Sequence, residues 1–181
     1  MKLRPEELGK RAAEAGLSVE DLAAAVERTG LDGPRAVSAV RNWLGGRDHP
    51  RCKKPDIERL AAAIGCEIKD IARFVSSVKN HRGSPRKAKL VVDLVRGKPY
   101  SEAEDALRFS TKRAATNAFK ALQAARTEAE EIGADETRLI VSEARVDGST
   151  HIKRFQPKDR GRAHPILKRQ SHITIGVQEK A

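Results

Sequence analysis

The segment Arg154–Val177, RFQPKDRGRAHPILKRQSHITIGV, joins a basic run containing proline and glycine to an alternating apolar pattern. Its last residues, SHITIGV (171–177), alternate as a strand does, and so does the earlier segment TRLIVSEARV (137–146). If the two pair in antiparallel fashion, residues 139–155 and 162–177 form the arms of one hairpin, each about 50 Å long at roughly 3.3 Å per residue. The sequence therefore predicts a hairpin that is too long for a small domain to cover.

The outer part of this hairpin is strongly basic. Residues 151–172 contain seven Lys and Arg and one acidic residue, a net charge of +6. Such cations repel one another, and an isolated two-stranded ribbon is only marginally stable in water. Solvated cations are usually interspersed with acids. Because acidic residues are nearly absent here, contact with a polyanion is favoured over a solubilising role.

The charge of the whole chain favours the same kind of partner. The 181 residues carry a net charge of +11. Residues 1–75 account for +2 of it and residues 76–181 for +9. Aromatic residues make up only 3%, which argues against a protein that stacks single-stranded bases on aromatic rings. Phosphate contact and recognition of folded RNA shape are expected instead.

Several other functions lack their sequence signals. No apolar run approaches the roughly 20 residues of a membrane helix, and the first residues lack the apolar block of a secretory signal. Cys52 and Cys66 indicate no disulfide framework, so a cytoplasmic location is expected. With His49 they would still lack a fourth zinc ligand, and no metal or other cofactor is expected. His164 and His172 have no triad partners, and the chain is not expected to be an enzyme.

Residues 1–75 are predicted to form short helices. The expected helices cover residues 5–15, 18–28 with a Ser18–Asp21 cap, 33–44, 56–64 and 68–75. The segments GLS (16–18), VSAVRNW (37–43) and LAAAIG (60–65) resemble the Cro/repressor-like helix-turn-helix family.

That resemblance implies that Gly33–Leu44 enters the DNA major groove and offers Arg35, Ser38 and Arg41. The turn ERTGLDGPR (27–35) is longer than the tight turn of that family. The net charge of +2 is also weak for an independent DNA-binding domain. A helical packing or docking module is therefore favoured over sequence-specific DNA recognition.

The second half begins with the helical segment SPRKAKLVVDLVRGK (84–98). Ser84 is its expected N-cap, and Leu90, Val91, Leu94 and Val95 are its expected buried stripe. Its basic first turn is unfavourable for the helix dipole, and it is either tolerated at small cost or held in place by an anion. Helices are also expected over 101–109 and 111–131, the latter with a buried seam of Ala115, Ala118, Phe119, Leu122, Ala125 and Ala129.

The segments GSPRKAKLVVDLVRGK (83–98), KRAA (112–115), KRFQPKDRGRA (153–163) and KRQSHIT (168–174) resemble the large-subunit ribosomal protein L-twenty-two (uL-twenty-two) family. The resemblance extends over residues 79–177. It implies an α+β fold, in which a body of three helices on a small antiparallel sheet carries an extended β-hairpin (139–177). The chain would divide into a small all-α domain (1–75) and a ribosomal domain (76–181). The first body strand is expected within SSVKNHRG (76–83), with no clear start.

The resemblance also implies a function. Members are structural constituents of the large ribosomal subunit that bind 23S-type rRNA and support early subunit assembly, and the hairpin tip lines the nascent-peptide tunnel. The implied partners are large-subunit rRNA, neighbouring ribosomal proteins and the nascent peptide, with neither a membrane nor DNA. The alternative is a helix-turn-helix DNA-binding regulator with a basic RNA-binding tail, which leaves the long hairpin without a role. An RNA-processing enzyme is a third class, and no catalytic constellation supports it.

By match to the family and by charge, the expected site residues form two overlapping sets. The expected rRNA-binding residues are Arg82, Ser84, Arg86, Lys87, Lys89, Lys98, Lys112, Arg113, Lys153, Arg154, Lys158, Arg160, Arg162, His164, Lys168, Arg169 and His172. The expected tunnel-lining tip comprises Ile152, Lys153, Arg154, Phe155, Gln156, Pro157, Lys158 and Arg160.

Overall fold

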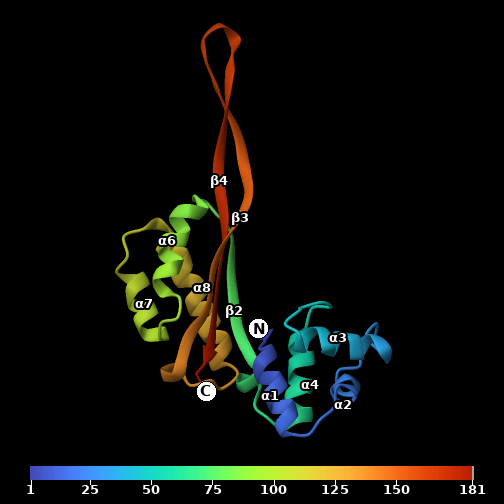
Figure 1. Cartoon of the computed structure of the whole chain (residues 1–181). Helices are drawn as coiled ribbons and strands as arrows, with labels where there is room; N and C mark the ends of the chain where they lie inside the picture. Colours follow the sequence, from blue (N-terminus) through green and yellow to red (C-terminus); the bar gives the residue numbers. More distant parts are fainter. Residues whose placement is uncertain (181) are drawn as a thin grey trace.

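The computed structural model describes residues 1–180 and contains a helical module, an α+β body and a long β-hairpin that rises from the body (Figure 1). We call residues 1–71 the N-terminal module. The elements in chain order are β1 (Lys2–Leu3), α1 (Pro5–Glu14), α2 (Val19–Ala25), α3 (Pro34–Leu44), α4 (Lys54–Ile64), α5 (Ile68–Ile71), β2 (Ala72–His81), α6 (Pro85–Val95), α7 (Tyr100–Arg108), α8 (Arg113–Glu130), η1 (Glu136–Arg138), β3 (Leu139–Pro157), η2 (Asp159–Gly161) and β4 (Ala163–Glu179). The predicted α+β class is confirmed.

One antiparallel sheet, in the strand order β1-β2-β4-β3, organises the body. Strand β4 pairs with β2 on one side and with β3 on the other. The β3–β4 pairing runs from Leu139 opposite Glu179 at the base to Pro157 opposite Ala163 beside the turn. The predicted long hairpin is therefore confirmed, and residues 158–162 form its turn.

Helices α6, α7 and α8 form the helical layer of the body beside the sheet (Figure 1). Helix α8 packs against β2 and β4, and α6 packs against β3. The alanines of α8 allow its backbone to approach the sheet closely, while larger side chains of the strands fill the space between. The core includes Phe74, Val91, Val95, Ala118, Leu122, Ile173 and Ile175.

The first body strand begins earlier than the sequence indicates. A helix was predicted over residues 68–75, but α5 ends at Ile71 and β2 starts at Ala72. In β2, Ala72 and Phe74 are buried while Arg73 and Val75 are half-buried, the period-two pattern of a strand. Pairing of Phe74 with Val177 in the sheet outweighs the local helical pattern.

The buried face of α6 also differs from the prediction. Leu90 and Leu94 were expected in the core, yet they are 64% and 45% exposed. Ala88, Val92 and the correctly predicted Val91 and Val95 are buried instead. Because the segment LVVDLV offers apolar residues on overlapping faces, periodicity alone cannot select one. Packing against β3 and α8 selects the face with the smaller side chains.

The N-terminal module is joined to the body through β1. Strand β1 pairs with β2 and extends the sheet by one strand. Next to it, the Arg4 N–H donates to the Ile71 carbonyl over 2.8 Å. The Arg4 guanidinium also donates to the Asp70 carbonyl, over 3.1 Å. The module has its own core, which includes Leu8, Leu22, Trp43, Ile57 and Leu60.

The module lies at the end of the body that is remote from the hairpin turn (Figure 1). Its predicted Ser18–Asp21 capping box is confirmed at the start of α2. No helix among residues 1–180 is both long and apolar enough to cross a membrane.

We predict that Leu122→Ala and Leu94→Ala differ strongly in their effect on stability. Leu122 is fully buried in α8, so its truncation should leave a cavity and lower the free energy of unfolding by about 2–5 kcal/mol. The same substitution at the exposed Leu94 should change it by less than about 1 kcal/mol. Urea unfolding of the two variants measures both values. Equal losses would contradict the observed face of α6.

Candidate nucleic-acid interface

The outer part of the hairpin is a bare two-stranded ribbon. Residues 153–169 are all exposed, and their two strands pair only with each other. We call this segment the distal hairpin. No carboxylate among the described residues forms an ion pair with its seven cations, which are Lys153, Arg154, Lys158, Arg160, Arg162, Lys168 and Arg169. The predicted excess of positive charge is therefore also uncompensated in three dimensions.

Both faces of the ribbon combine charged and apolar side chains. Residues that are paired directly across an antiparallel ladder share a face. Arg154 pairs with Ile166, and Ile152 pairs with Lys168, so one face carries two cations near the base of the ribbon. On the other face Lys153 pairs with Leu167, and Phe155 and Leu167 are 74% and 54% exposed. Both faces of the ribbon therefore carry cations beside exposed apolar side chains.

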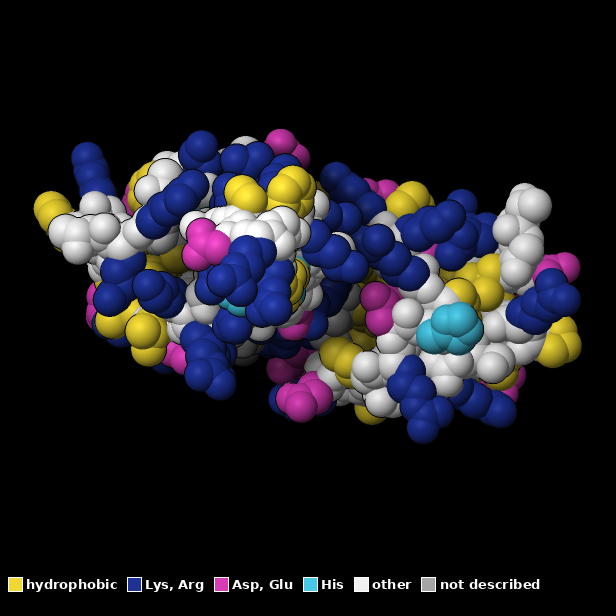
Figure 2. Space-filling model, turned by 90° about the horizontal axis from the view of Figure 1, so that it is seen from above, with side chains coloured by type: hydrophobic (Ala, Val, Ile, Leu, Met, Phe, Trp, Pro, Cys, Tyr) yellow, Lys and Arg dark blue, Asp and Glu magenta, His cyan; other side chains and the backbone are white. Residues whose placement is uncertain are grey.

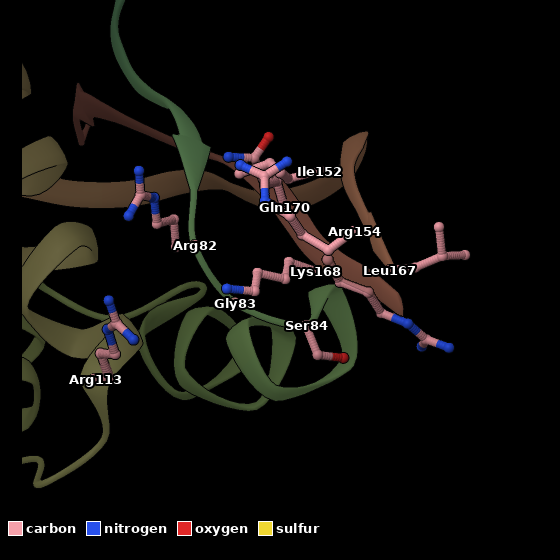
Figure 3. A pocket seen from close by; sticks show the side chains of 10 residues that line it. Arg82, Gly83, Ser84, Arg113, Ile152, Arg154, Leu167, Lys168 and Gln170 are labelled. Carbon is pink, nitrogen blue, oxygen red and sulfur yellow. The ribbon is translucent and has the colours of Figure 1, made fainter. Parts of the chain in front are cut away.

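A basic groove lies where the distal hairpin meets the body. Arg82, Gly83 and Ser84 follow β2, Arg113 opens α8, and Arg154 and Lys168 come from the ribbon (Figure 3). A second hollow also includes Arg82, Gly83 and Ser84, and it continues along α6 and the start of α8. We call the two together the basic groove, lined by Arg82, Ser84, Lys87, Lys112, Arg113, Arg154, Lys168 and Arg169.

Two helix N-termini open onto this groove. Helix α6 starts at Pro85 and α8 at Arg113, and both first turns lack acidic residues. Ser84 occupies the predicted N-cap position, but its hydroxyl makes no capping bond within residues 1–180. The free backbone N–H groups and the positive ends of both helix dipoles therefore add to the cationic side chains. This arrangement suits a phosphate group.

The wall of the groove is held by His81 and Gly83. His81 is buried, and its Nδ1 lies 2.6 Å from the Asn117 side-chain nitrogen. Burial, with a smaller contribution from the Arg113 charge, lowers the pKa of His81. A Cβ atom at Gly83 would lie 2.6 Å from His81 Nε2. A glycine is therefore required if the chain is to pass over the imidazole and enter α6.

The other predicted site residues are distributed as follows. The groove includes Arg82, Ser84, Lys87, Lys112 and Arg113 of the body, while Arg86 and Lys89 are exposed elsewhere on α6. His164 is exposed on the ribbon. Lys98 lies beyond the far end of α6, where its carbonyl accepts from the Val141 N–H over 2.9 Å. It is separated from the basic groove by the length of that helix.

His172 and Asn80 form a junction that sequence reasoning missed. The Asn80 N–H donates to His172 Nδ1 over 3.1 Å, so His172 is engaged within the protein. Asn80 has a positive φ of 56°, and its side-chain oxygen accepts from Ser149 Oγ over 2.7 Å. An asparagine tolerates this left-handed conformation better than most residues. Its presence in the unclear segment before Ser84 was the available signal for the irregularity in β2, where the pairing register shifts between Val78 and His81.

Lys and Arg side chains dominate the face seen from the hairpin end of the molecule (Figure 2).

No cluster of three potential metal-ligating side chains occurs among residues 1–180. The Cys52 thiol is buried, and burial, followed by the charges of Asp56 and Asp48, raises its pKa to about 12. It is therefore protonated at neutral pH.

A compact body with a long bare ribbon is the fold of a structural binding protein. A family model described as ribosomal protein L22p/L17e matches residues 76–178. Over 116 residues the chain is 42% identical to large ribosomal subunit protein uL22 of Clostridium novyi (strain NT), covering 64% of this chain and 99% of that protein. Over 103 residues it is 46% identical to the uL22 of Magnetococcus marinus, covering 56% and 91%. Over 106 residues it is 46% identical to the uL22 of Metamycoplasma arthritidis, covering 58% and 50%.

The chain belongs to the ribosomal protein L22p/L17e family. It is thus a structural, non-enzymatic protein of the large ribosomal subunit, as the sequence predicted. The family match begins at residue 76. The helix-turn-helix resemblance of residues 1–75, and the division of the chain at that point, stay predictions.

We predict that Gly83→Ala is destabilising in the native chain and nearly neutral when His81 is also replaced. The added methyl group would press on the His81 imidazole, and His81→Ala removes that ring. The coupling free energy between the two substitutions should therefore fall in the range of about 0.5–3 kcal/mol that contacting residues show. Urea unfolding of the single and double variants completes the cycle. Additive effects would show that the imidazole does not constrain Gly83.

Proposed function

We propose that the distal hairpin and the basic groove bind large-subunit rRNA, and that the hairpin tip lines the nascent-peptide tunnel. Binding of this kind would let the protein organise the RNA around it early in assembly of the subunit. Neighbouring ribosomal proteins and the nascent peptide are the other expected partners. The rRNA would hold the protein in place, and the ribbon would reach from the body into the folded RNA.

One observation carries this proposal: residues 153–169 are exposed throughout and bear seven cations without acidic partners. A ribbon of this kind buries too little apolar surface to be stable by itself. Its cations also repel one another at separations that water screens only in part. Phosphate groups on both sides of the ribbon would remove both penalties, since they supply counter-charge and exclude water.

The basic groove supports the same proposal from the body. It is continuous with the base of the ribbon through Arg154 and Lys168. Two helix N-termini add backbone donors, which bind phosphate oxygens without regard to sequence. An RNA strand lying in the groove would therefore run directly onto the ribbon. The two surfaces would then act as one interface that recognises the shape of the folded RNA.

The tip of the hairpin is narrow. Arg160 and Gly161 both adopt left-handed conformations, with φ of 56° and 72°, and close the turn tightly. The neighbouring strands of such a ribbon are only about 5 Å apart. Phe155, which is 74% exposed, offers a contact surface for a passing peptide.

We predict that Arg160→Gln/Arg162→Gln lowers the salt dependence of binding to a large-subunit rRNA transcript. Each phosphate contact contributes about 0.7–0.9 to the slope of log K against log salt concentration, because counterions are released. The double variant should lose up to about 1.8 units. Filter binding at several salt concentrations measures the slope. The free energy of unfolding should stay within about 0.5 kcal/mol, since both side chains are exposed.

The matched control is Lys10→Gln/Lys69→Gln. It removes two cations whose charges are already paired with Glu7 and Glu67. Its slope should equal that of the native chain. If the hairpin variant also keeps the native slope while binding persists, the cations of the ribbon are merely solvated and the proposal fails.

The tunnel assignment has a separate test. A photo-crosslinking amino acid in place of Gln156 should form an adduct with a stalled nascent chain in translating ribosomes. The same group in place of Glu131, which is exposed at the end of α8 on the body, should form none. Equal yields at the two positions would argue against a tunnel-lining tip.

A further inference from the structure

The N-terminal module carries a second group of cations without acidic partners. Most of its Lys and Arg side chains are engaged in ion pairs: Lys2, Arg4, Lys10, Arg11, Arg28, Arg41 and Lys69. Arg59 donates to the Glu27 carbonyl over 3.0 Å. Within residues 1–180 the remaining five form no ion pair, and all are exposed: Arg35, Arg47, Arg51, Lys53 and Lys54. The cations of the module therefore fall into an ion-paired group and an unpaired, exposed group.

Four of these five cations lie in one surface segment, residues 45–54, which runs from the end of α3 to the first residue of α4 and which we call the basic loop. Hydrogen bonds from α3 hold the backbone of this loop. Trp43, which is buried, donates through Nε1 to the Pro50 carbonyl over 2.6 Å. The Asn42 side chain donates to the His49 carbonyl over 2.9 Å. Both anchors hold the loop to α3.

Two acidic side chains complete this support. Asp48 accepts from the Cys52 N–H over 2.8 Å, and Asp56 accepts from the Lys53 N–H over 2.9 Å. These two carboxylates thus accept hydrogen bonds from the loop backbone, and the buried Asp56 is also paired with Arg28. The loop is preorganised, and its cations stay free. Preorganisation lowers the entropic cost of binding.

A groove connects the basic loop to α3. It is lined by Arg28, Arg35 and Ser38 on one side and by His49 and Pro50 of the loop on the other. The fifth unpaired cation, Arg35, therefore lies along the same surface as the loop. We call Arg35 and the basic loop together the basic face of the module.

The position of this face relative to the body is fixed. Strand β1 ties the module to β2, and Arg47 borders a hollow that also includes Arg73 and Glu143 of the body. An RNA bound at the basic groove and one bound at the basic loop would thus be held in a defined relative arrangement. Two contacts on one rigid chain strengthen each other through a high effective concentration.

From this arrangement, and given the rRNA binding proposed above, we propose that the basic loop and Arg35 bind the phosphate backbone of a second segment of large-subunit rRNA. That segment is distinct from the RNA at the hairpin and the basic groove. We expect the contacts to go to phosphates rather than to bases, because double-stranded RNA exposes little sequence information to side chains. The module thereby adds a second RNA anchor at the end of the molecule remote from the hairpin.

The surface chemistry favours RNA over a protein partner. Protein interfaces are anchored by buried aromatic or aliphatic side chains. The exposed large hydrophobic residues of the described chain lie at 90, 94, 109, 155, 166 and 167, all outside the module. DNA recognition by α3 is also disfavoured. Arg41, one of its expected base-reading residues, is paired with Glu20 at 3.6 Å.

The experiment compares two double variants of the full chain, Arg51→Gln/Lys54→Gln and the control Lys10→Gln/Lys69→Gln. Binding to the complete large-subunit rRNA transcript is measured by filter binding at several salt concentrations with excess tRNA as competitor. The loop variant should lower the slope by about 1.4–1.8 units, and the control should not change it. Hydroxyl-radical footprinting should show that the loop variant loses protection of one rRNA segment and keeps the rest.

Two further variants separate the possible failures. Arg51→Lys/Lys54→Arg keeps the charge and should keep the slope, and an unchanged free energy of unfolding of Arg51→Gln/Lys54→Gln excludes misfolding as the cause of a loss. If the loop variant keeps the native slope and footprint while Arg160→Gln/Arg162→Gln lowers the slope, the second anchor does not exist and the hairpin proposal stands. If neither pair changes the slope, the proposed rRNA binding fails and the second anchor fails with it.

Discussion

The antiparallel ladder between β3 and β4 is the interaction on which the rest of the structure depends. At its base the ladder forms part of a sheet that α6 and α8 cover, and its inward side chains are buried. Beyond residue 152 the same ladder continues with its backbone hydrogen bonds made but with no core to bury. The stable base thus fixes the register of a segment that could not specify it alone. The body serves as the foundation of the ribbon.

Positive charge follows the same division between supported and unsupported parts. Seven of the thirteen Lys and Arg of the N-terminal module have a carboxylate beside them, whereas the distal hairpin, the basic groove and the basic loop have cations without partners. Surface ion pairs contribute little to stability, so pairing is not needed to hold the fold. Leaving these particular cations without carboxylates therefore forgoes only a small pairing energy and preserves their charge for a polyanion.

Particular elements show how far the sequence could be interpreted. The alternation in residues 137–146 and 171–177 predicted the hairpin, because a period of two is typical of half-buried strands and not of helices. Periodicity failed for α6, where Leu90 and Leu94 were as apolar as their buried neighbours, and for residues 72–75, where a strand continues directly from a helix. The resemblance to a known family predicted most cations of the basic groove as binding residues. The engagement of His172 by Asn80 was invisible, because the two residues are 92 positions apart.

The sequence by itself determined the hairpin, the helical module and the excess of positive charge beyond residue 76, since each depends on local pattern or composition. The tertiary structure alone decided which residues act together. It brought Arg82, Arg113 and Lys168 to one groove, placed β1 on the edge of the body sheet, and separated the paired cations of the module from the unpaired ones. These outcomes depend on contacts between distant segments, and such contacts are set by how whole faces pack rather than by any one stretch of residues.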